Sequence, residues 1–385
     1  ILLMLSLVPF RSMAGEEGAR GHSDTVAGQH ANHEAGAADA GHAQMPEAGD
    51  AHHGEKAFNA GKMIIHHVLD AHEWHMADIG KVHITIPLPI ILWDKDEKQL
   101  VSFWSSKLEH GHAAYKGFML ATEGEHEGRI VKVLPGTMQA DPGASLPIDL
   151  SITKTVLAIF ISMLILSLIF ISIARRYSRD ANRAPRGLQS WMEPLILFVR
   201  DEIARPSIGD KRYERYMPFL LSVFFFILLN NFMGLIPIFP GGANVTGNIA
   251  VTLVLALFTF IITTFSGNKH YWMHIFNTPG VPWWLKLPFP LLPIVEFLGI
   301  FIKPFVLMVR LFANITAGHV IILGFMSLIF IFGNMNTWLG YGVSAVSVPF
   351  AIFMNLLELL VAFIQAYVFT LLSALYFGMA IEEHH

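Results

Sequence analysis

The stretch "VLMVRLFANITAGHVIILGF", residues 306–325, decides the fold class of this 385-residue chain. It is apolar enough to form a helix across a lipid bilayer, yet it carries Arg310 near its middle. On insertion scales, a charge at the centre of a membrane helix costs about 2.5–3.5 kcal/mol. Such a residue therefore faces protein or water, and the function that it indicates by default is an ion path.

The composition agrees with an integral membrane protein, because 53% of the residues are hydrophobic and only 15% are charged. We expect an all-α polytopic membrane protein with about five membrane-embedded helices. The predicted spans are residues 156–174, 217–240, 248–266, about 290–332 and 348–381. An uncharged turn, "GNMNTWLGYG", joins the last two spans and predicts a long antiparallel hairpin.

Charge placement predicts the orientation of the chain. The Arg-rich segment "RRYSRDANRAPR" follows the first span, and the positive-inside rule places such a cluster in the cytoplasm. Residues 1–14 are similar to the end of a secretory signal peptide, which agrees with an extracytoplasmic N-terminus. We expect a cytoplasmic C-terminus and, over "SWMEPLILFVRDEIARPSIG", an amphipathic helix on the cytoplasmic face. Whether the signal segment is cleaved stays open.

Two regions precede the membrane domain, which we assign to residues 146–385. Residues 15–60 are rich in His, Ala and Gly and are predicted to be disordered. Their His residues have no clean ligand spacing, so Zn²⁺ or Cu²⁺ binding and a solvated tail both stay open. Residues 61–145 predict a small extracytoplasmic β-rich module. It has one strand over "KVHITIPLPIILW", which Pro87 and Pro89 push to a sheet edge, and further strands in "QLVSFW", "YKGFMLA" and "RIVKVLP".

The last two apolar segments contain ionisable residues that lie far from any polar loop. They are Glu296, Lys303, Arg310 and His319 in the fourth segment and Glu358 in the fifth. Several unpaired charges together would cost around 10 kcal/mol, which is comparable to the stability of an ordinary domain. Lys303 and Glu296 are a weaker indication, because they could pair with one another or extend towards the interface.

Helical spacing groups the polar residues of these two segments. Arg310 and Asn314 are four residues apart and share a helix face. Glu358, Gln365 and Tyr376 form one polar stripe on the last helix. One register of the predicted hairpin places His319 opposite Glu358 and Arg310 within a turn of Gln365.

This pattern predicts a proton path. Imidazole and carboxylate groups exchange protons near neutral pH, whereas the arginine guanidinium stays charged. A proton that enters through His319 and Glu358 would therefore stop at Arg310 and leave the chain for a carrier. A secondary ion-coupled or proton-coupled transporter is the alternative, although such folds show two repeated halves, and no internal repeat is present. A structural anchor would leave the buried charges unexplained. The sequence has no P-loop pattern, so we expect no nucleotide chemistry in this chain.

The fragment "RLFANITAGH" resembles the Arg-Leu-Phe-x-Asn-x-x-Ala-Gly motif of subunit a of the F-type ATP synthase. "NVT", "IKPFVLMVR", "FIQAYVF" and "YFGMA" fit the order and spacing of that family over roughly residues 150–385. The resemblance implies a proton-channel stator in the Fo sector, in the inner membrane of a bacterium. It implies the c-ring, the peripheral-stalk b subunits and membrane lipid as partners, and no cofactor, nucleotide or nucleic acid. H⁺ suits the His–Glu pair, and Na⁺ stays open.

The resemblance also implies roles for single residues. Arg310 would be the essential arginine that faces the carboxylates of the c-ring, and Asn314 and Gln365 would orient it. His319, Glu358 and Glu296 would line the periplasmic half-channel, and Tyr376 would lie towards the cytoplasmic one. Many bacterial members carry Glu at the position of His319 and His at that of Glu358. Here the two are exchanged, which preserves one acid and one imidazole in the same register.

Overall fold

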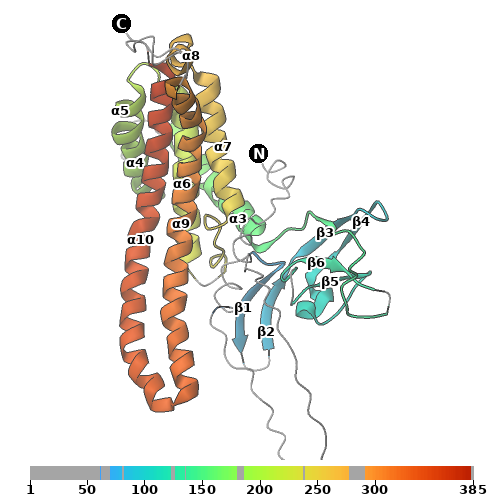
Figure 1. Cartoon of the computed structure of the whole chain (residues 1–385). Helices are drawn as coiled ribbons and strands as arrows, with labels where there is room; N and C mark the ends of the chain where they lie inside the picture. The colour runs from blue at the N-terminus through green and yellow to red at the C-terminus, as the bar shows by residue number, and fades with distance from the viewer. Residues whose placement is uncertain are drawn as a thin grey trace, which may run out of the picture. The chain divides into compact units, whose positions relative to one another are not determined.

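The computed structural model of the chain (Figure 1) describes residues 61, 70–79, 82–122, 126–134, 136–179, 186–236, 239–276 and 291–382. The predicted signal segment 1–14 and the His-rich segment 15–60 lie outside the described residues. The interpretations of those segments, including metal binding by the tail, stay predictions.

Helices make up most of the described chain after residue 150. In chain order they are α3 (Lys154–Arg179), α4 (Leu188–Phe198), the π-helical η2 (Val199–Ala204), α5 (Arg205–Ile208), α6 (Tyr213–Leu235), α7 (Ile249–Ser266), α8 (Lys269–Phe276), α9 (Leu291–Met335) and α10 (Thr337–Ile381). Within the described residues, five helices are long and apolar enough to cross a membrane, namely α3, α6, α7, α9 and α10. The predicted fold class, an all-α multi-pass membrane protein, is confirmed.

The last two helices form the predicted long hairpin (Figure 1), but the predicted ten-residue turn is wrong. Residues 333–342 are helical except at Asn336, whose side chain accepts a hydrogen bond from the backbone N–H of Trp338. This N-cap lets α10 begin directly after α9 ends. Glycines let the two helices meet closely there, because a Cβ on Gly340 would lie 2.8 Å from the Cα of Gly333.

The second predicted span also ends earlier than expected. Helix α6 stops at Leu235, and Ile236 is extended, with φ −89° and ψ 113°. The sequence places Pro237 directly after Ile236. A residue before proline is disfavoured in the α conformation, which explains why the helix ends before residue 240.

Helix α6 is the most enclosed of the membrane-spanning helices in the described chain. Its Phe225 ring packs edge-on against Phe170 of α3, and its Tyr216 ring stacks on Phe377 of α10 at 5.0 Å. The predicted amphipathic segment is helical over α4, η2 and α5 and buries Ile203 against this core. Gly378 of α10 permits that packing, because a Cβ there would overlap sterically with the Ser207 carbonyl oxygen. Helices α9 and α10 have more of their surface exposed than α6.

The region before the helices contains the predicted short strands. They are β1 (Glu73–Ile79), β2 (Val82–Pro87), β3 (Pro89–Asp94), β4 (Gln99–Trp104), β5 (Phe118–Leu120), β6 (Ile130–Lys132) and β7 (Ile148–Asp149). A 3₁₀ helix, η1 (Ser105–Gly111), follows β4. The strands form an antiparallel β1–β2 pair, a three-stranded sheet in the order β4–β3–β7, and a β5–β6 pair.

The prediction of one edge strand over residues 81–93 is wrong. The chain divides at Leu88, and β3 lies in the middle of its sheet rather than at an edge. Pro89 is tolerated because it is the first residue of β3 and β7 pairs only with Leu92 and Trp93. The period of two is nonetheless present, since Ile90 and Leu92 are fully buried in the small core of this region.

An ion pair joins the two ends of the β-rich region. His72 Nε2 and Asp149 Oδ2 are 2.5 Å apart. Burial opposes the charged form of His72, but the hydrogen bond and negative charge of Asp149 outweigh it and raise the pKa of the imidazole. The same contact lowers the pKa of Asp149 against the effect of its burial. Strand β7 is thereby connected to the segment that leads into β1.

Candidate functional site

The α9–α10 hairpin has the register that the sequence predicts. Phe325 and Phe350 pack with ring centroids 4.0 Å apart. Further along, His319 Nδ1 lies 3.5 Å from Glu358 Oε1, so the structure brings together the predicted imidazole–carboxylate pair. In an antiparallel hairpin, one correct pair determines all the others, because each helix rises by the same amount per residue.

The His319–Glu358 pair is largely enclosed. The side chain of Glu358 is 4% exposed and that of His319 is 16% exposed. The contact between them is an ion pair by distance, but neither carboxylate oxygen of Glu358 has a hydrogen-bond partner among the described residues. A buried polar group without partners is costly and is often found where chemistry occurs. The geometry therefore suits a carboxyl group that gains and loses a proton.

Gly318 makes room for Glu358. A Cβ built on this glycine would lie 2.7 Å from Glu358 Oε1 and 2.9 Å from its carboxyl carbon. The carboxylate is therefore packed directly against the backbone of α9, one residue before His319. Sequence reasoning missed this role, although a glycine next to an intramembrane histidine was an available signal.

The end of α6 approaches His319, and the α6–α7 connection contacts Thr316, three residues before it. A Cβ on Gly234 of α6 would lie 3.8 Å from His319 Nε2. The Thr316 hydroxyl donates a hydrogen bond to the Gly247 carbonyl at 3.5 Å. Asn231 supports this arrangement, because its Nδ2 donates to the Ala362 carbonyl at 3.0 Å and its Oδ1 accepts from the Thr246 hydroxyl at 2.5 Å. Asn231 therefore makes hydrogen bonds that join α6 to α10 and to the α6–α7 connection.

Arg310 and Asn314 lie on the exposed surface of α9, one turn apart. In the described chain, no hydrogen bond or ion pair of Arg310 is found, and none joins it to Asn314 or to Gln365. Gln365 itself is buried on α10, at 6% exposure. The structure places all three residues on the same hairpin, and the orienting role of Asn314 and Gln365 stays a prediction. An exposed cation within a membrane span needs a polar partner from outside the bundle.

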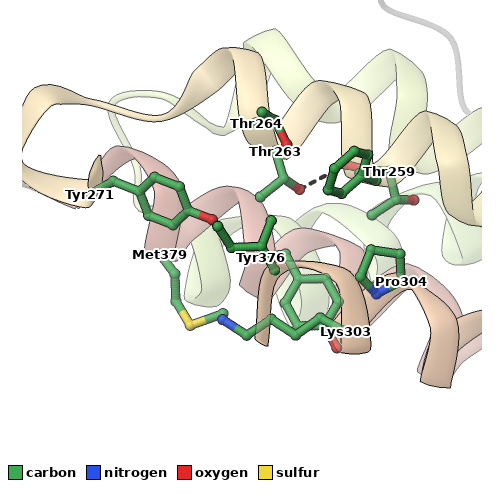
Figure 2. Close-up of a pocket in the computed structure, with 10 residues that line it drawn as sticks. Thr259, Thr263, Thr264, Tyr271, Lys303, Pro304, Tyr376 and Met379 are labelled. Atoms are coloured by element: carbon green, nitrogen blue, oxygen red, sulfur yellow. Dashed lines mark hydrogen bonds between the residues drawn. The ribbon is translucent and has the colours of Figure 1, made fainter. Parts of the chain in front are cut away.

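A second polar group lies near the end of the hairpin where α9 begins and α10 ends. The Lys303 ammonium lies 5.8 Å from the centre of the Tyr376 ring. Both residues line a narrow crevice with Tyr271 of α8 and threonines of α7. Figure 2 shows Tyr271 reaching from α8 towards Tyr376, and Lys303 extending past that ring towards Met379. Sequence reasoning missed Tyr271, because nothing local links it to the hairpin.

Glu296 belongs with this second group. Burial and, to a smaller extent, the negative charge of Glu296 raise the pKa of Tyr271, which connects the two side chains. Glu296 precedes His319 by 23 residues on one continuous helix, which is about 34 Å of α-helix. The structure therefore does not bring Glu296 together with His319 and Glu358, as the predicted half-channel required. It brings Glu296 towards the end where Tyr376 lies.

Comparison with known proteins agrees with this architecture. A family model described as the ATP synthase A chain matches residues 156–378. The chain belongs to this family. Family membership decides against the secondary transporter and agrees with the five spans.

Individual relatives support the assignment. The chain is 45% identical to ATP synthase subunit a of Chloroherpeton thalassium over 61% of this chain and 69% of the relative. It is 46% identical to ATP synthase subunit a of Myxococcus xanthus, over 62% of this chain and 75% of the relative. A relative from Chlorobium phaeobacteroides strain BS1, also an ATP synthase subunit a, is 38% identical over 92% of this chain and 86% of its own length. A second family model, described as a domain of unknown function, matches residues 63–150.

Proposed function

We propose that this chain is the proton-channel stator subunit of the Fo sector of an ATP synthase. Family membership supports a membrane-sector role in general. The observation that carries the finer proposal is the pairing of two features on one hairpin: a buried His319–Glu358 contact and an exposed Arg310. Arg310 precedes His319 by nine residues, which is about 13 Å along the helix.

The distribution of basic residues supports an orientation for the bundle. The connection between α6 and α7 and the turn at Asn336 contain no Lys or Arg. Basic residues instead lie at the end of α3, before α6 and at the start of α8, at Arg175, Arg176, Lys211, Arg212 and Lys269. By the positive-inside rule, that basic end would face the cytoplasm of a bacterium with the C-terminus, and the β-rich module would lie outside the inner membrane.

The proposed mechanism is proton exchange with a neighbouring rotor ring. A proton from outside passes by way of His319 and Glu358, whose groups exchange protons near neutral pH. Arg310 keeps its proton and blocks a direct leak along the hairpin. Its charge favours the ionised form of a c-ring carboxylate that faces it, which forces that carboxylate to release its proton before passing. Each charge that crosses 100 mV delivers about 2.3 kcal/mol to rotation.

The second polar group would serve the other half of the path. Glu296, Lys303 and Tyr376 lie towards the basic end of the hairpin and would guide protons from the ring to the cytoplasm. The exposed apolar faces of α9 and α10 support contact with the ring and with lipid, and the peripheral-stalk b subunits would bind elsewhere on the chain. Nucleotide chemistry would occur in other subunits, and the translocated ion would be H⁺.

The test is ATP-driven proton pumping in inverted membrane vesicles that contain equal amounts of assembled complex. Arg310→Ala is expected to abolish pumping, because Arg310 is the only arginine in the described residues of α9 and α10 and Lys303 lies two turns away from it. The double exchange His319→Glu with Glu358→His is expected to retain part of it, since the pair keeps one acid and one imidazole.

The matched control is Arg175→Ala, which removes an exposed arginine at the end of α3 and is expected to pump normally. Normal pumping by Arg310→Ala would contradict the proposal. So would an exchange variant that is no more active than Glu358→Ala alone, because the two residues would then not act as a pair.

A further inference from the structure

A basic pocket lies at one end of the helix bundle, and its lining residues differ from those of the two polar groups of the hairpin. It is open to solvent and lies between the residues around the start of α6, the α7–α8 link and the last turn of α10. Three of its lining residues are cations and one is a carboxylate, so the pocket carries a net positive charge. The lining residues are Lys211, Arg212, Glu214, Arg215, Tyr216, Ser266, Asn268 and Ile381.

Hydrogen bonds hold the wall of this pocket in place. Arg212 Nη1 donates to the Ile381 carbonyl at 3.1 Å, and Asn268 Nδ2 donates to the same carbonyl at 2.9 Å. The backbone N–H of Asn268 donates to the Ala380 carbonyl, also at 2.9 Å. The three chain segments are thus joined at one point, and the pocket is part of the fold rather than a gap between loose loops.

Two of the cations are available to an anion. Lys211 and Arg215 are exposed, and neither forms an ion pair with any residue that the structure describes. The Arg215 guanidinium lies 6.0 Å from the centre of the Tyr216 ring, whose side chain is buried, so it is held near the pocket wall. Guanidinium and ammonium groups in such positions are the usual ligands of phosphate groups.

The surroundings favour a lipid over a soluble phosphate. The pocket lies where three membrane-spanning helices begin or end, at Tyr213, Ser266 and Ile381, which is the depth of lipid headgroups. On α7, the exposed side chains of Leu257, Ile261 and Phe265 follow one another at four-residue spacing, on one helix face. This stripe ends one residue before Ser266, at the pocket itself.

We propose that this pocket binds the phosphate headgroup of an anionic phospholipid, whose acyl chains lie along the α7 stripe of Leu257, Ile261 and Phe265. Basic pockets between membrane helices recognise such headgroups because the phosphate gains several charge-assisted hydrogen bonds there. The lipid would connect α6, α7 and the end of α10 at the membrane surface. The proposal does not depend on the proton path described above.

The test is to titrate the purified full-length chain with phosphatidylglycerol or phosphatidylcholine. Native mass spectrometry measures how much lipid the chain binds. In the variant Lys211→Gln/Arg215→Gln, phosphatidylglycerol binding is expected to weaken roughly 30-fold, since each cation contributes about a factor of five. Phosphatidylcholine binding is expected not to change. The matched control is Arg175→Gln/Arg176→Gln, which removes two exposed cations outside the pocket and is expected to bind phosphatidylglycerol as the wild type does.

Several results would overturn the proposal. Equal losses in the pocket and control variants would mean attraction by the general surface charge, and no loss in the pocket variant would exclude the site. Displacement of the lipid by millimolar inorganic phosphate would indicate a site for free phosphate. A second assay uses the absence of native cysteine: in the assembled complex, Ser266→Cys is expected to be protected from a charged thiol reagent by phosphatidylglycerol. Protection that persists without anionic lipid would mean that a neighbouring subunit fills the pocket.

Discussion

Gly318 offers the sharpest test of the His319–Glu358 pair, because a single methyl group there should separate the two side chains. A Cβ at residue 318 would lie 2.7 Å from Glu358 Oε1, whereas non-bonded heavy atoms prefer about 3.5 Å or more. The carboxylate must then withdraw by roughly 0.8 Å. The 3.5 Å contact with His319 would open accordingly.

The expected consequence is slower proton transfer with an intact fold. A misplacement of about 1 Å can reduce the rate of a positioned reaction by up to about 100-fold, so we expect Gly318→Ala to lower ATP-driven proton pumping by about 10-fold. Glycine-to-alanine changes in helices stabilise the helix by about 1 kcal/mol, so unfolding of α9 would not explain a loss of proton pumping. The assay is fluorescence quenching in inverted vesicles at matched levels of assembled complex.

Gly324→Ala is the matched control, because Gly324 lies on the same helix as Gly318 and a Cβ there would meet nothing within 4 Å. It is expected to pump normally. In the Gly318→Ala background, Glu358→Asp shortens the acid by one methylene group and is expected to restore part of the activity. Equal pumping by Gly318→Ala and Gly324→Ala would refute the contact between the carboxylate and the α9 backbone as the cause.

Two further predictions concern stability. Because the pKa of His72 is raised above its ordinary value of 6.5 and that of Asp149 is lowered below its ordinary value of 3.8, their contact should stabilise the β-rich region fully between about pH 4 and 6.5 and weaken as the pH rises further. Hydrogen exchange of β7, corrected for intrinsic rates, should show less protection at pH 8 than at pH 6, and His72→Gln should remove that difference. Asn231→Ala leaves the Thr246 hydroxyl without its acceptor and should destabilise the helices by about 1–3 kcal/mol in thermal unfolding in detergent. Ser222→Ala on the exposed face of α6 should change little, and equal effects of the two would argue against the Asn231 network.

Much of the membrane architecture was predictable from the sequence alone. Long uncharged runs identify membrane helices because the bilayer excludes charge, and all five predicted spans are present as helices. The pairing of His319 with Glu358 was also predictable, since a hairpin of two continuous helices allows few registers. The exact ends were less predictable, because capping at Asn336 and the proline after Ile236 act locally and override the hydropathy pattern.

Other features depended on contacts between distant segments. Only the tertiary structure placed β3 between β4 and β7, and only it connected Glu296 with Tyr271 rather than with His319. The same holds for the approach of Gly234, at the end of α6, to His319. Periodicity determines which residues share a helix face or strand face, but it does not determine which element packs against that face. That choice follows from the fit of whole surfaces, and here it decided which polar residues of the hairpin belong to the same group.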